Sequence, residues 1–373
     1  MFIIFVKKLQ LSQKGDHSKS ALKVNKGIEQ PVSFNPDAVR QLKKKGREIN
    51  NPVDYFEGIK EGNRMILSKA ITLIESSHPG HLALAQEIID RCLPLSGKSI
   101  RIGITGVPGV GKSTFIESLG TYLTSRNHKL AVLAIDPSSE KTKGSILGDK
   151  TRMEKLANNP DAFIRPSPSA GSLGGVARKT KEIIILCEAA GFDTIFVETV
   201  GVGQSEITVH SMVDFFLLLM LSGAGDELQG IKRGIMEMAD MIVINKADGD
   251  NLDKARLAKL EYANAVHLFA PSASGWIPEV GLCSAATGYG IDKVWEVIEK
   301  YRQLTLANGY FELNRKSQNR NNFYNILQES LLNRFYSNIE IGKSIKKAEL
   351  DVQSGKSTPF AAVQQLLDKY TGY

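Results

Sequence analysis

A glycine-rich run in the first third of the chain has the residue types and spacing that bind phosphate. Gly106-Val107-Pro108-Gly109-Val110-Gly111-Lys112-Ser113 matches G-x-x-x-x-G-K-[ST] at each fixed position. Glycines allow a tight turn whose N–H groups point inward, and a following helix N-terminus adds partial positive charge. Lys112 would reach the β- and γ-phosphates of a nucleotide, and Ser113 would hold Mg²⁺. The predicted phosphate site comprises Gly106, Pro108, Gly109, Val110, Gly111, Lys112, Ser113 and Thr114.

The flanking residues supply the elements that such a loop needs. Residues 99–105 read as a short buried strand, and residues 113–119 read as the start of a helix. The alternative is a glycine-rich turn in an ordinary α/β protein. The lysine and the serine, placed between a strand and a helix, favour the phosphate loop.

A second motif lies about 130 residues further on and predicts which base is bound. Asn245-Lys246-Ala247-Asp248 follows a predicted strand and fits N-K-x-D. The Asp248 carboxylate would accept hydrogen bonds from guanine N1–H and the exocyclic amine, which adenine does not offer. Asn245 would brace the loops, and the Lys246 stem would lie along the base. Ser284 and Ala285 fit a second base-contacting turn; the alternative for the whole motif is a turn that caps a strand.

Three carboxylates near predicted strand ends are candidate Mg²⁺ ligands together with Ser113, because Mg²⁺ prefers oxygen donors. They are Asp136, Asp149 and Glu198. Asp136 could instead cap a turn, and Asp149 could be a surface acid. Glu198 begins an E-x-x-G sequence, and it places the Gly201 N–H where a γ-phosphate would be sensed.

The residues around Gly201 predict slow hydrolysis by the isolated chain. Small GTPases carry D-x-x-G here and many follow it with a water-orienting glutamine, whereas this chain has E-x-x-G and then Val202. Arginine supplied to such a site is worth ~10³–10⁵ in rate, and Arg152 is a candidate within the chain. The predicted catalytic residues are Lys112, Glu198 and Arg152.

Composition indicates an ordinary globular protein in a reducing compartment. The chain has 373 residues, 42% of them hydrophobic, and a net charge of +7. Residues 1–48 hold eleven basic and four acidic residues, which is the whole excess, so nucleic-acid binding is not indicated. Cys92, Cys187 and Cys283 lack paired spacing, and the longest apolar run is too short for a bilayer. We expect a cytoplasmic protein with no membrane or nucleic-acid partner.

The apolar pattern predicts an α/β fold with a mostly parallel sheet, a helical hairpin before it and a helical extension after it. We expect a flexible basic segment at 1–45, a helical region at 46–97, a nucleotide domain at 98–300 and a helical tail at 301–373. The candidate strands are Ile100–Thr105, Leu130–Asp136, Ala162–Arg165, Thr194–Glu198, Phe215–Leu221, Met241–Asn245 and Gly281–Ser284.

The motifs, with Ser172-Leu173-Gly174-Gly175 and Glu198–Glu206 among them, occur in an order that resembles the MeaB/MMAA (ArgK-like) family of P-loop GTPases. The resemblance covers about residues 55–373. It implies GTP/GDP and Mg²⁺ as ligands, the metal involving Ser113, Asp136, Asp149 and Glu198. It also implies a homodimer held by the C-terminal helices. A third switch segment at 223–234 would couple to a partner through Asp226 and Lys232.

The resemblance also implies a chaperone function. In this family the GTPase cycle gates adenosylcobalamin loading into a cobalamin-dependent acyl-CoA mutase, such as methylmalonyl-CoA mutase, and protects that enzyme. An alternative is a nucleotide-dependent kinase of the ArgK amino-acid transport type, against which the guanine motif argues. A nickel metallochaperone is a third reading, but the six histidines are scattered.

Overall fold

The computed structural model describes residues 51–76, 78–135, 153–166, 173–199, 205–223, 233–269 and 272–372. By its internal contacts the chain divides into Met1–Ile49 and Asn50–Tyr373, and the described residues all belong to the second unit. The predictions about residues 1–45 therefore lie outside the described residues. So do the predicted site residues Asp136, Asp149, Arg152, Gly201, Asp226 and Lys232.

The described strands form one seven-stranded sheet, in the order β3-β2-β4-β1-β5-β6-β7, in which every neighbouring pair is parallel. The central strands are buried along their whole length, as parallel strands covered on both faces must be. The predicted α/β fold is confirmed, and each predicted strand lies within two residues of its observed ends. The strands are β1 (Ile100–Gly106), β2 (Leu130–Ile135), β3 (Ala162–Pro166), β4 (Thr194–Thr199), β5 (Phe215–Met220), β6 (Met241–Ile244) and β7 (Glu279–Leu282).

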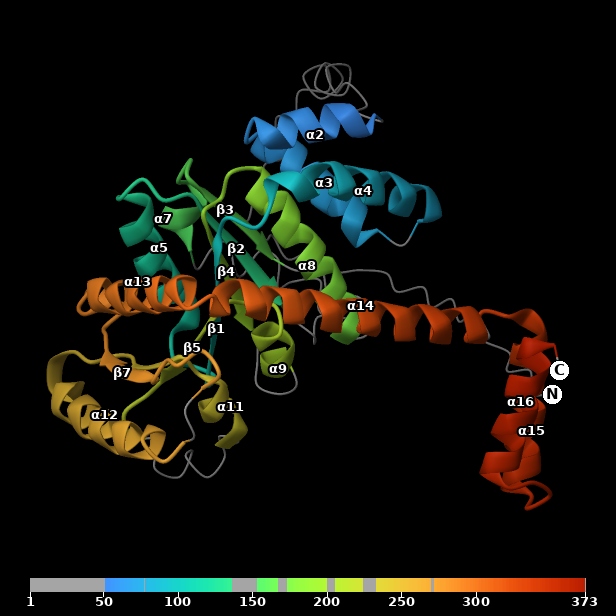
Figure 1. Ribbon diagram of the computed structural model, residues 1–373. Helices are drawn as coiled ribbons and strands as arrows, with labels where there is room; N and C mark the ends of the chain where they lie inside the picture. Colours follow the sequence, from blue (N-terminus) through green and yellow to red (C-terminus); the bar gives the residue numbers. More distant parts are fainter. Residues whose placement is uncertain are drawn as a thin grey trace, which may run out of the picture. The chain divides into compact units, whose positions relative to one another are not determined.

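Helices cover both faces of the sheet (Figure 1). Side chains of β5 alternate between these two faces. Leu217 and Leu219 pack in the cluster that includes α5 (Lys112–Thr124) and α13 (Ile291–Ala307). Leu218 and Met220 point the other way, into the cluster with α12. The remaining elements around the sheet are α7 (Glu154–Ala157), α8 (Leu173–Ala189), α9 (Ser205–His210), α11 (Arg233–Met238), η3 (Gly249–Asn251) and α12 (Leu252–Val266).

The predicted helical region before the sheet is present and packs against α8. Asn63 caps α3 by accepting hydrogen bonds from the backbone N–H groups of Met65 and Ile66. Arg165 of β3 forms an ion pair with Glu75, and Lys179 of α8 donates to the Glu75 carbonyl over 2.8 Å. The helices are α2 (Pro52–Lys60), α3 (Arg64–Glu75) and α4 (Pro79–Cys92), followed by η1 (Leu93–Leu95), so α2 precedes the two-helix pattern seen in the sequence.

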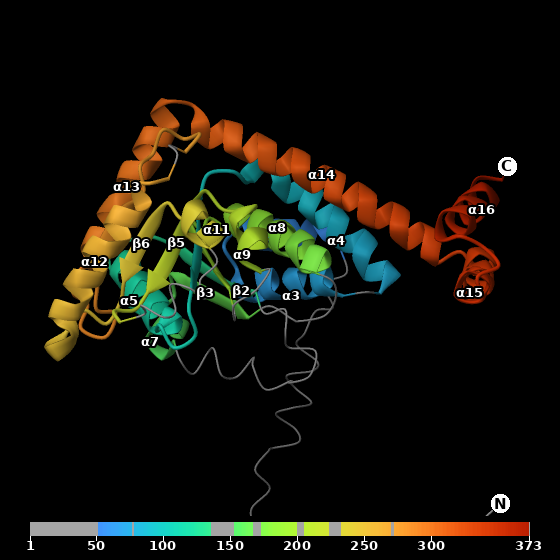
Figure 2. The same cartoon turned by 90° about the horizontal axis from the view of Figure 1, so that it is seen from below.

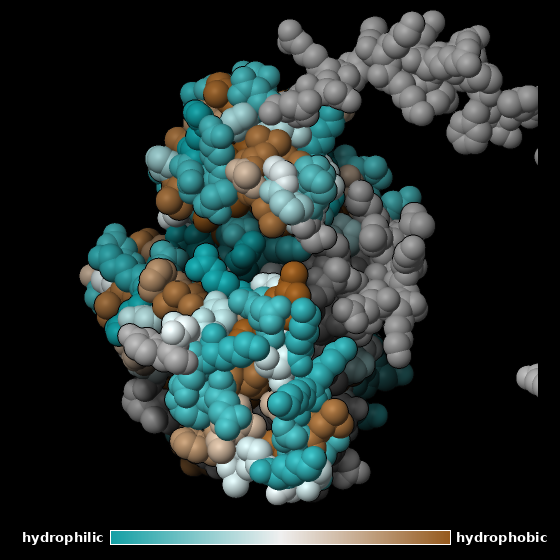
Figure 3. All heavy atoms as spheres, turned by 90° about the vertical axis from the view of Figure 1, so that its right-hand side faces the viewer, coloured by the Kyte–Doolittle hydropathy of each residue, from teal (hydrophilic) through white to brown (hydrophobic). Residues whose placement is uncertain are grey.

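The chain ends in a helical arm, defined here as α14 (Tyr310–Tyr336), α15 (Ile339–Gln353) and α16 (Pro359–Thr371). The first half of α14 packs on α8, and the helix then continues beyond the sheet to α15 and α16 (Figures 1 and 2). Hydrophobic residues lie on the surface of the face that contains α15 and α16 (Figure 3). Within the described ranges, no helix combines the length and apolarity needed to cross a membrane.

A buried ionic network fastens the arm to the amino-terminal edge of the sheet. The Arg315 guanidinium of α14 binds both carboxylate oxygens of Asp214, with N–O distances of 2.8 and 2.6 Å. It also donates to the backbone carbonyls of Gly97 and Ser99, each over 2.6 Å. The side chain of Asp214 is only 2% exposed, and it also accepts the Arg101 backbone N–H. One arginine thus joins α14 to the starts of β1 and β5.

Arg315→Ala is expected to lower the free energy of unfolding by about 3–5 kcal/mol, because it leaves the Asp214 carboxylate buried without its partner. Denaturant unfolding of the purified protein measures the change. Adding Asp214→Asn should recover part of the loss, since the stranded charge is then removed. Arg256→Ala is the matched control, because its ion pair with Asp253 is exposed and should contribute no more than about 1 kcal/mol. Equal losses in Arg315→Ala and the control would contradict this role.

Candidate functional site

The carboxyl ends of the central strands hold the described candidate residues. The phosphate loop leaves β1 at Gly106 and enters α5 at Lys112. Glu198 lies beside it on β4, in register with Ile104 of β1. The loop that carries Asn245 leaves β6, two strands away from β1. In open parallel sheets this edge is where ligands bind.

The backbone of the phosphate loop depends on two of its glycines. Gly106 has φ 157°, and a Cβ there would lie 2.5 Å from the Leu219 carbonyl oxygen of the neighbouring strand. Gly111 caps α5 in the left-handed region with φ 91°, where a side chain is strained. Val110 is fully buried, whereas Pro108 and Gly109 are exposed. The loop therefore presents its backbone at the N-terminus of α5, where N–H groups suit a phosphate.

Lys112 interacts both with the phosphate loop and with two nearby carboxylates. Its ammonium group donates to the Gly106 carbonyl over 2.8 Å. Burial lowers the pKa of Lys112, and the negative charges of Glu198 and Glu206 oppose that shift. Both carboxylates are buried, with 4% and 1% of each residue exposed. Glu206 could not be recognised as a site residue from the sequence, because only the fold brings the start of α9 close to Lys112.

The described residues fit a magnesium ion. Ser113 and Glu198 contribute a hydroxyl and a carboxylate, which are oxygen donors that Mg²⁺ accepts. Ser113 is half-buried in the first turn of α5, next to Lys112. The negative charge of Glu198 raises the pKa of that same lysine against the effect of burial. Mg²⁺ usually keeps several waters and binds through one or two protein groups plus substrate phosphates, and a hydroxyl with a carboxylate is compatible with that pattern.

Asn245 connects the phosphate loop to the loops beyond β6 and β7. Its amide nitrogen donates to the Val110 carbonyl over 2.8 Å. Its amide oxygen accepts the Ala285 backbone N–H over 3.0 Å and the Cys283 thiol over 3.4 Å. The residue is 1% exposed, so the three hydrogen bonds are shielded from water. The amide nitrogen and oxygen of this one side chain therefore connect the loops that follow β1, β6 and β7.

The rest of the N-K-x-D segment is held from both sides. The Lys246 ammonium crosses to the phosphate loop and donates to the Gly109 carbonyl over 2.9 Å. The Ser284 hydroxyl donates to the Asp248 carboxylate. Asn251, which sequence analysis did not select, donates to the Lys246 carbonyl over 2.7 Å and accepts from Ser222. Asp248 is thus positioned by a serine from the turn after β7.

The structure brings most of the described candidates together at one sheet edge. Asn245 and Lys246 each bond directly to the phosphate loop, and Ser284 bonds to Asp248. The roles assigned to single residues in binding and catalysis stay predictions. The described candidates are Gly106, Pro108, Gly109, Val110, Gly111, Lys112, Ser113, Thr114, Glu198, Asn245, Lys246, Asp248, Ser284 and Ala285.

Comparison with known proteins decides the family. Residues 67–340 match the family described as methylmalonyl Co-A mutase-associated GTPase MeaB. The chain belongs to the MeaB family. A probable GTPase of Mycobacterium tuberculosis is 49% identical to this MeaB-family protein over 310 residues, which are 83% of this chain and 92% of the relative. The mitochondrial methylmalonic aciduria type A homolog of Mus musculus is 45% identical over 325 residues, 84% and 78% of the two chains.

A solved structure agrees with the fold of this MeaB-family protein. The crystal structure of a LAO/AO transport system kinase superposes with a TM-score of 0.69 and 36% sequence identity. The match covers 86% of this chain and 97% of that one. Together with the relatives, it makes this chain a P-loop GTPase that binds GTP and GDP and hydrolyses GTP.

Asp248→Asn should weaken binding of GDP by about 10- to 100-fold, because a carboxylate that accepts two guanine donors becomes an amide. The same variant should gain affinity for xanthosine diphosphate, whose 2-keto oxygen can accept from the new amide. Titration with a fluorescent GDP analogue, competed by each unlabelled nucleotide, measures both changes.

Asp250→Asn is the matched control for this exchange, because Asp250 is exposed on η3 only two residues away and should leave both affinities unchanged. Unaltered guanine preference in Asp248→Asn would contradict the assignment. So would displacement of the analogue by ATP as readily as by GTP.

Proposed function

We propose that this MeaB-family GTPase is a G-protein chaperone of a cobalamin-dependent acyl-CoA mutase of the methylmalonyl-CoA mutase type. Its nucleotide cycle would gate adenosylcobalamin loading and protect the mutase from inactivation. The observation that carries the proposal is the match of residues 67–340 to a family described as methylmalonyl Co-A mutase-associated. The mouse relative, named for methylmalonic aciduria, supports it.

The chain's own groups would bind and orient the nucleotide as follows. The α5 N-terminus and Lys112 hold the phosphates, with the ammonium placed against the β- and γ-phosphoryl oxygens. Asp248 and the Ser284–Ala285 turn read the guanine edge, and Asn245 keeps that turn in register with the phosphate loop. Because Asn245 is buried, the distance between base site and phosphate site is fixed before the ligand arrives.

The metal site proposed here uses Ser113 and Glu198, with Asp136 and Asp149 as further ligands. Mg²⁺, when bound, neutralises charge on the phosphates. Glu198 would also keep the Lys112 ammonium charged despite its burial, as the direction of its effect on the Lys112 pKa indicates. Gly201 would report the γ-phosphate, Arg152 would stabilise charge during hydrolysis, and Asp226 and Lys232 would couple to the partner.

A kinase is the second candidate, because the solved neighbour is described as a LAO/AO transport system kinase. Phosphoryl transfer to a small molecule requires an acceptor placed next to the terminal phosphate. The Lys246–Gly109 contact and the Asp248–Ser284 contact support a guanine-selective arrangement, as expected of a GTPase. A cytoplasmic location is part of the proposal, and it is supported by the free, buried thiols of Cys92, Cys187 and Cys283.

The arm supports the proposed homodimer. Exposed apolar side chains follow α14 at four-residue steps, Phe323 at 62%, Leu327 at 42% and Leu331 at 56% exposed. Residues four apart lie on one helix face, so these three form a continuous apolar stripe. Phe360 of α16 is 82% exposed and adds to the apolar surface of the arm. Contiguous surfaces of this kind mark protein interfaces.

Leu331→Glu should convert the dimer to a monomer, because it places a charge in the apolar stripe of α14. Multi-angle light scattering during size-exclusion chromatography gives the mass directly. Leu257→Glu is the control, since Leu257 is at least as exposed, at 63%, but lies on α12. A monomeric wild-type protein, or a Leu331→Glu variant that stays dimeric, would contradict the proposal.

Single-turnover GTP hydrolysis tests the chaperone function. The isolated protein should hydrolyse GTP slowly, and addition of a purified cobalamin-dependent mutase of the methylmalonyl-CoA mutase type should accelerate the reaction. Lys112→Ala should abolish the stimulated rate in the same assay, because the ammonium that faces the phosphates is lost. Fast hydrolysis by the isolated protein, or no effect of the mutase on rate or affinity, would contradict the function proposed here.

A further inference from the structure

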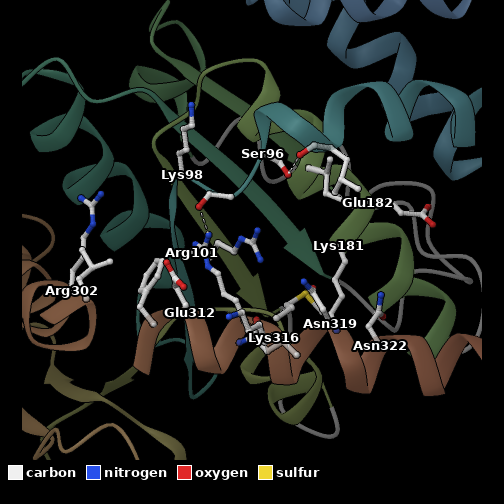
Figure 4. Close-up of a pocket in the computed structure, with 18 residues that line it drawn as sticks. Ser96, Lys98, Arg101, Lys181, Glu182, Arg302, Glu312, Lys316, Asn319 and Asn322 are labelled. Atoms are coloured by element: carbon white, nitrogen blue, oxygen red, sulfur yellow. Dashed lines mark hydrogen bonds between the residues drawn. The ribbon is translucent and has the colours of Figure 1, made fainter. Parts of the chain in front are cut away.

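A second cleft lies at the amino-terminal edge of the sheet, away from the phosphate loop. Its volume is about 590 Å³, which is within the usual range for small-molecule sites. Its walls are the residues just before β1, one side of α8, and the start of α14 with the end of α13 (Figure 4). Nothing in the nucleotide site described above uses this cleft.

The three arginines that line the cleft are each paired with an acid, and Arg302 pairs with Glu299 at 3.6 Å. Arg101 forms an ion pair with Glu188 at 2.9 Å, and Arg315 forms one with Asp214 at 2.6 Å. Their guanidinium groups are therefore held as part of the wall. The remaining charges of the cleft decide what it can bind.

Three lysines give the cleft an excess of positive charge. Lys98 precedes β1, Lys181 comes from α8, and Lys316 comes from α14. Within the described ranges none of them has an ion pair or hydrogen bond to another side chain. The unpaired acid on the lining is Glu312, since Glu182 pairs with Arg178. The lysines thus outnumber the acid that could balance them.

Lys181 shows this imbalance most clearly. It is half-buried on α8, and burial followed by the charge of Arg101 lowers its pKa to about 8. A nearby anion would relieve both effects, because it stabilises the charged ammonium. Asn319 and Asn322 of α14 line the same cleft as Lys181 (Figure 4), and their amides can donate to an anion bound there.

The cleft also has an apolar part. Met212, Leu306 and Phe311 line it together with the lysines. Phe311 is fixed in place because the Arg315 guanidinium stacks over its ring at 4.3 Å. A ligand with an apolar body attached to an anionic head would use both kinds of lining. Small-molecule sites typically combine an apolar lining with a few polar groups in this way.

We propose that this cleft is a binding site for a phosphate monoester with an apolar body, whose dianionic head lies between Lys181 and Lys316. The charge of a phosphate matches the surplus of the lysines, and ammonium groups bind phosphate as point charges. Because the walls come from α8 and α14, the ligand contacts both a helix that packs on the sheet and the first helix of the arm. The site is independent of guanine nucleotide binding.

Calorimetric titration of the full-length protein with phenyl phosphate tests the proposal, with GDP and Mg²⁺ present at saturation so that the nucleotide site is filled. Phenyl phosphate should bind the wild type more tightly than inorganic phosphate does. Lys181→Gln and Lys316→Gln should each lower its affinity at least about tenfold, through loss of a charged contact. Lys300→Gln, which removes an exposed lysine of α13 outside the cleft, is the matched control.

The other outcomes overturn the proposal. Equal binding by all variants would place the ligand elsewhere, and equal affinity for inorganic phosphate would remove the role of the apolar wall. Lysine-dependent binding of a hexaglutamate peptide without binding of phenyl phosphate would assign the cleft to an acidic partner protein. Lys316 is exposed, so its replacement leaves folding intact even if Lys181→Gln does not fold; unchanged GDP affinity verifies this.

Discussion

The buried amide of Asn245 is the contact on which the nucleotide site depends. With one nitrogen and one oxygen it fixes the phosphate loop after β1 and the turn after β7. A buried amide that is fully hydrogen-bonded tolerates little displacement, because each lost bond leaves a polar atom without water. The parallel sheet supplies the rigid frame, and this side chain sets the spacing of the loops above it.

The local geometry of the candidate nucleotide site was predictable where the sequence itself fixes the backbone. Gly106 and Gly111 are required by their backbone angles, and Lys112 follows from its position in the loop, so spacing alone located them. Glu206 was missed because its proximity to Lys112 arises only from tertiary folding. Asn251 lies only three residues after Asp248, but a polar residue at a turn carries no signal that distinguishes a brace from a surface group.

Similar reasons explain which parts of the fold were predictable from the sequence. Continuous apolar runs identified the buried strands, whereas β7 lies at the sheet edge, is partly exposed, and begins two residues before the sequence pattern indicated. Arg315 looked like an ordinary helix-surface residue, since arginine is seldom buried unless paired. Its partner Asp214 lies 101 positions away, and no local pattern could connect the two.

The attachment of α14 at Arg315 has a mechanical consequence. The helix continues for about 30 Å beyond this arginine, at 1.5 Å per residue, before α15 and α16 begin. It therefore has the geometry of a lever that pivots next to the N-terminal ends of β1 and β5. A tilt of a few degrees there would swing the tip by a few ångströms, so small strains within the sheet would be amplified at the far end.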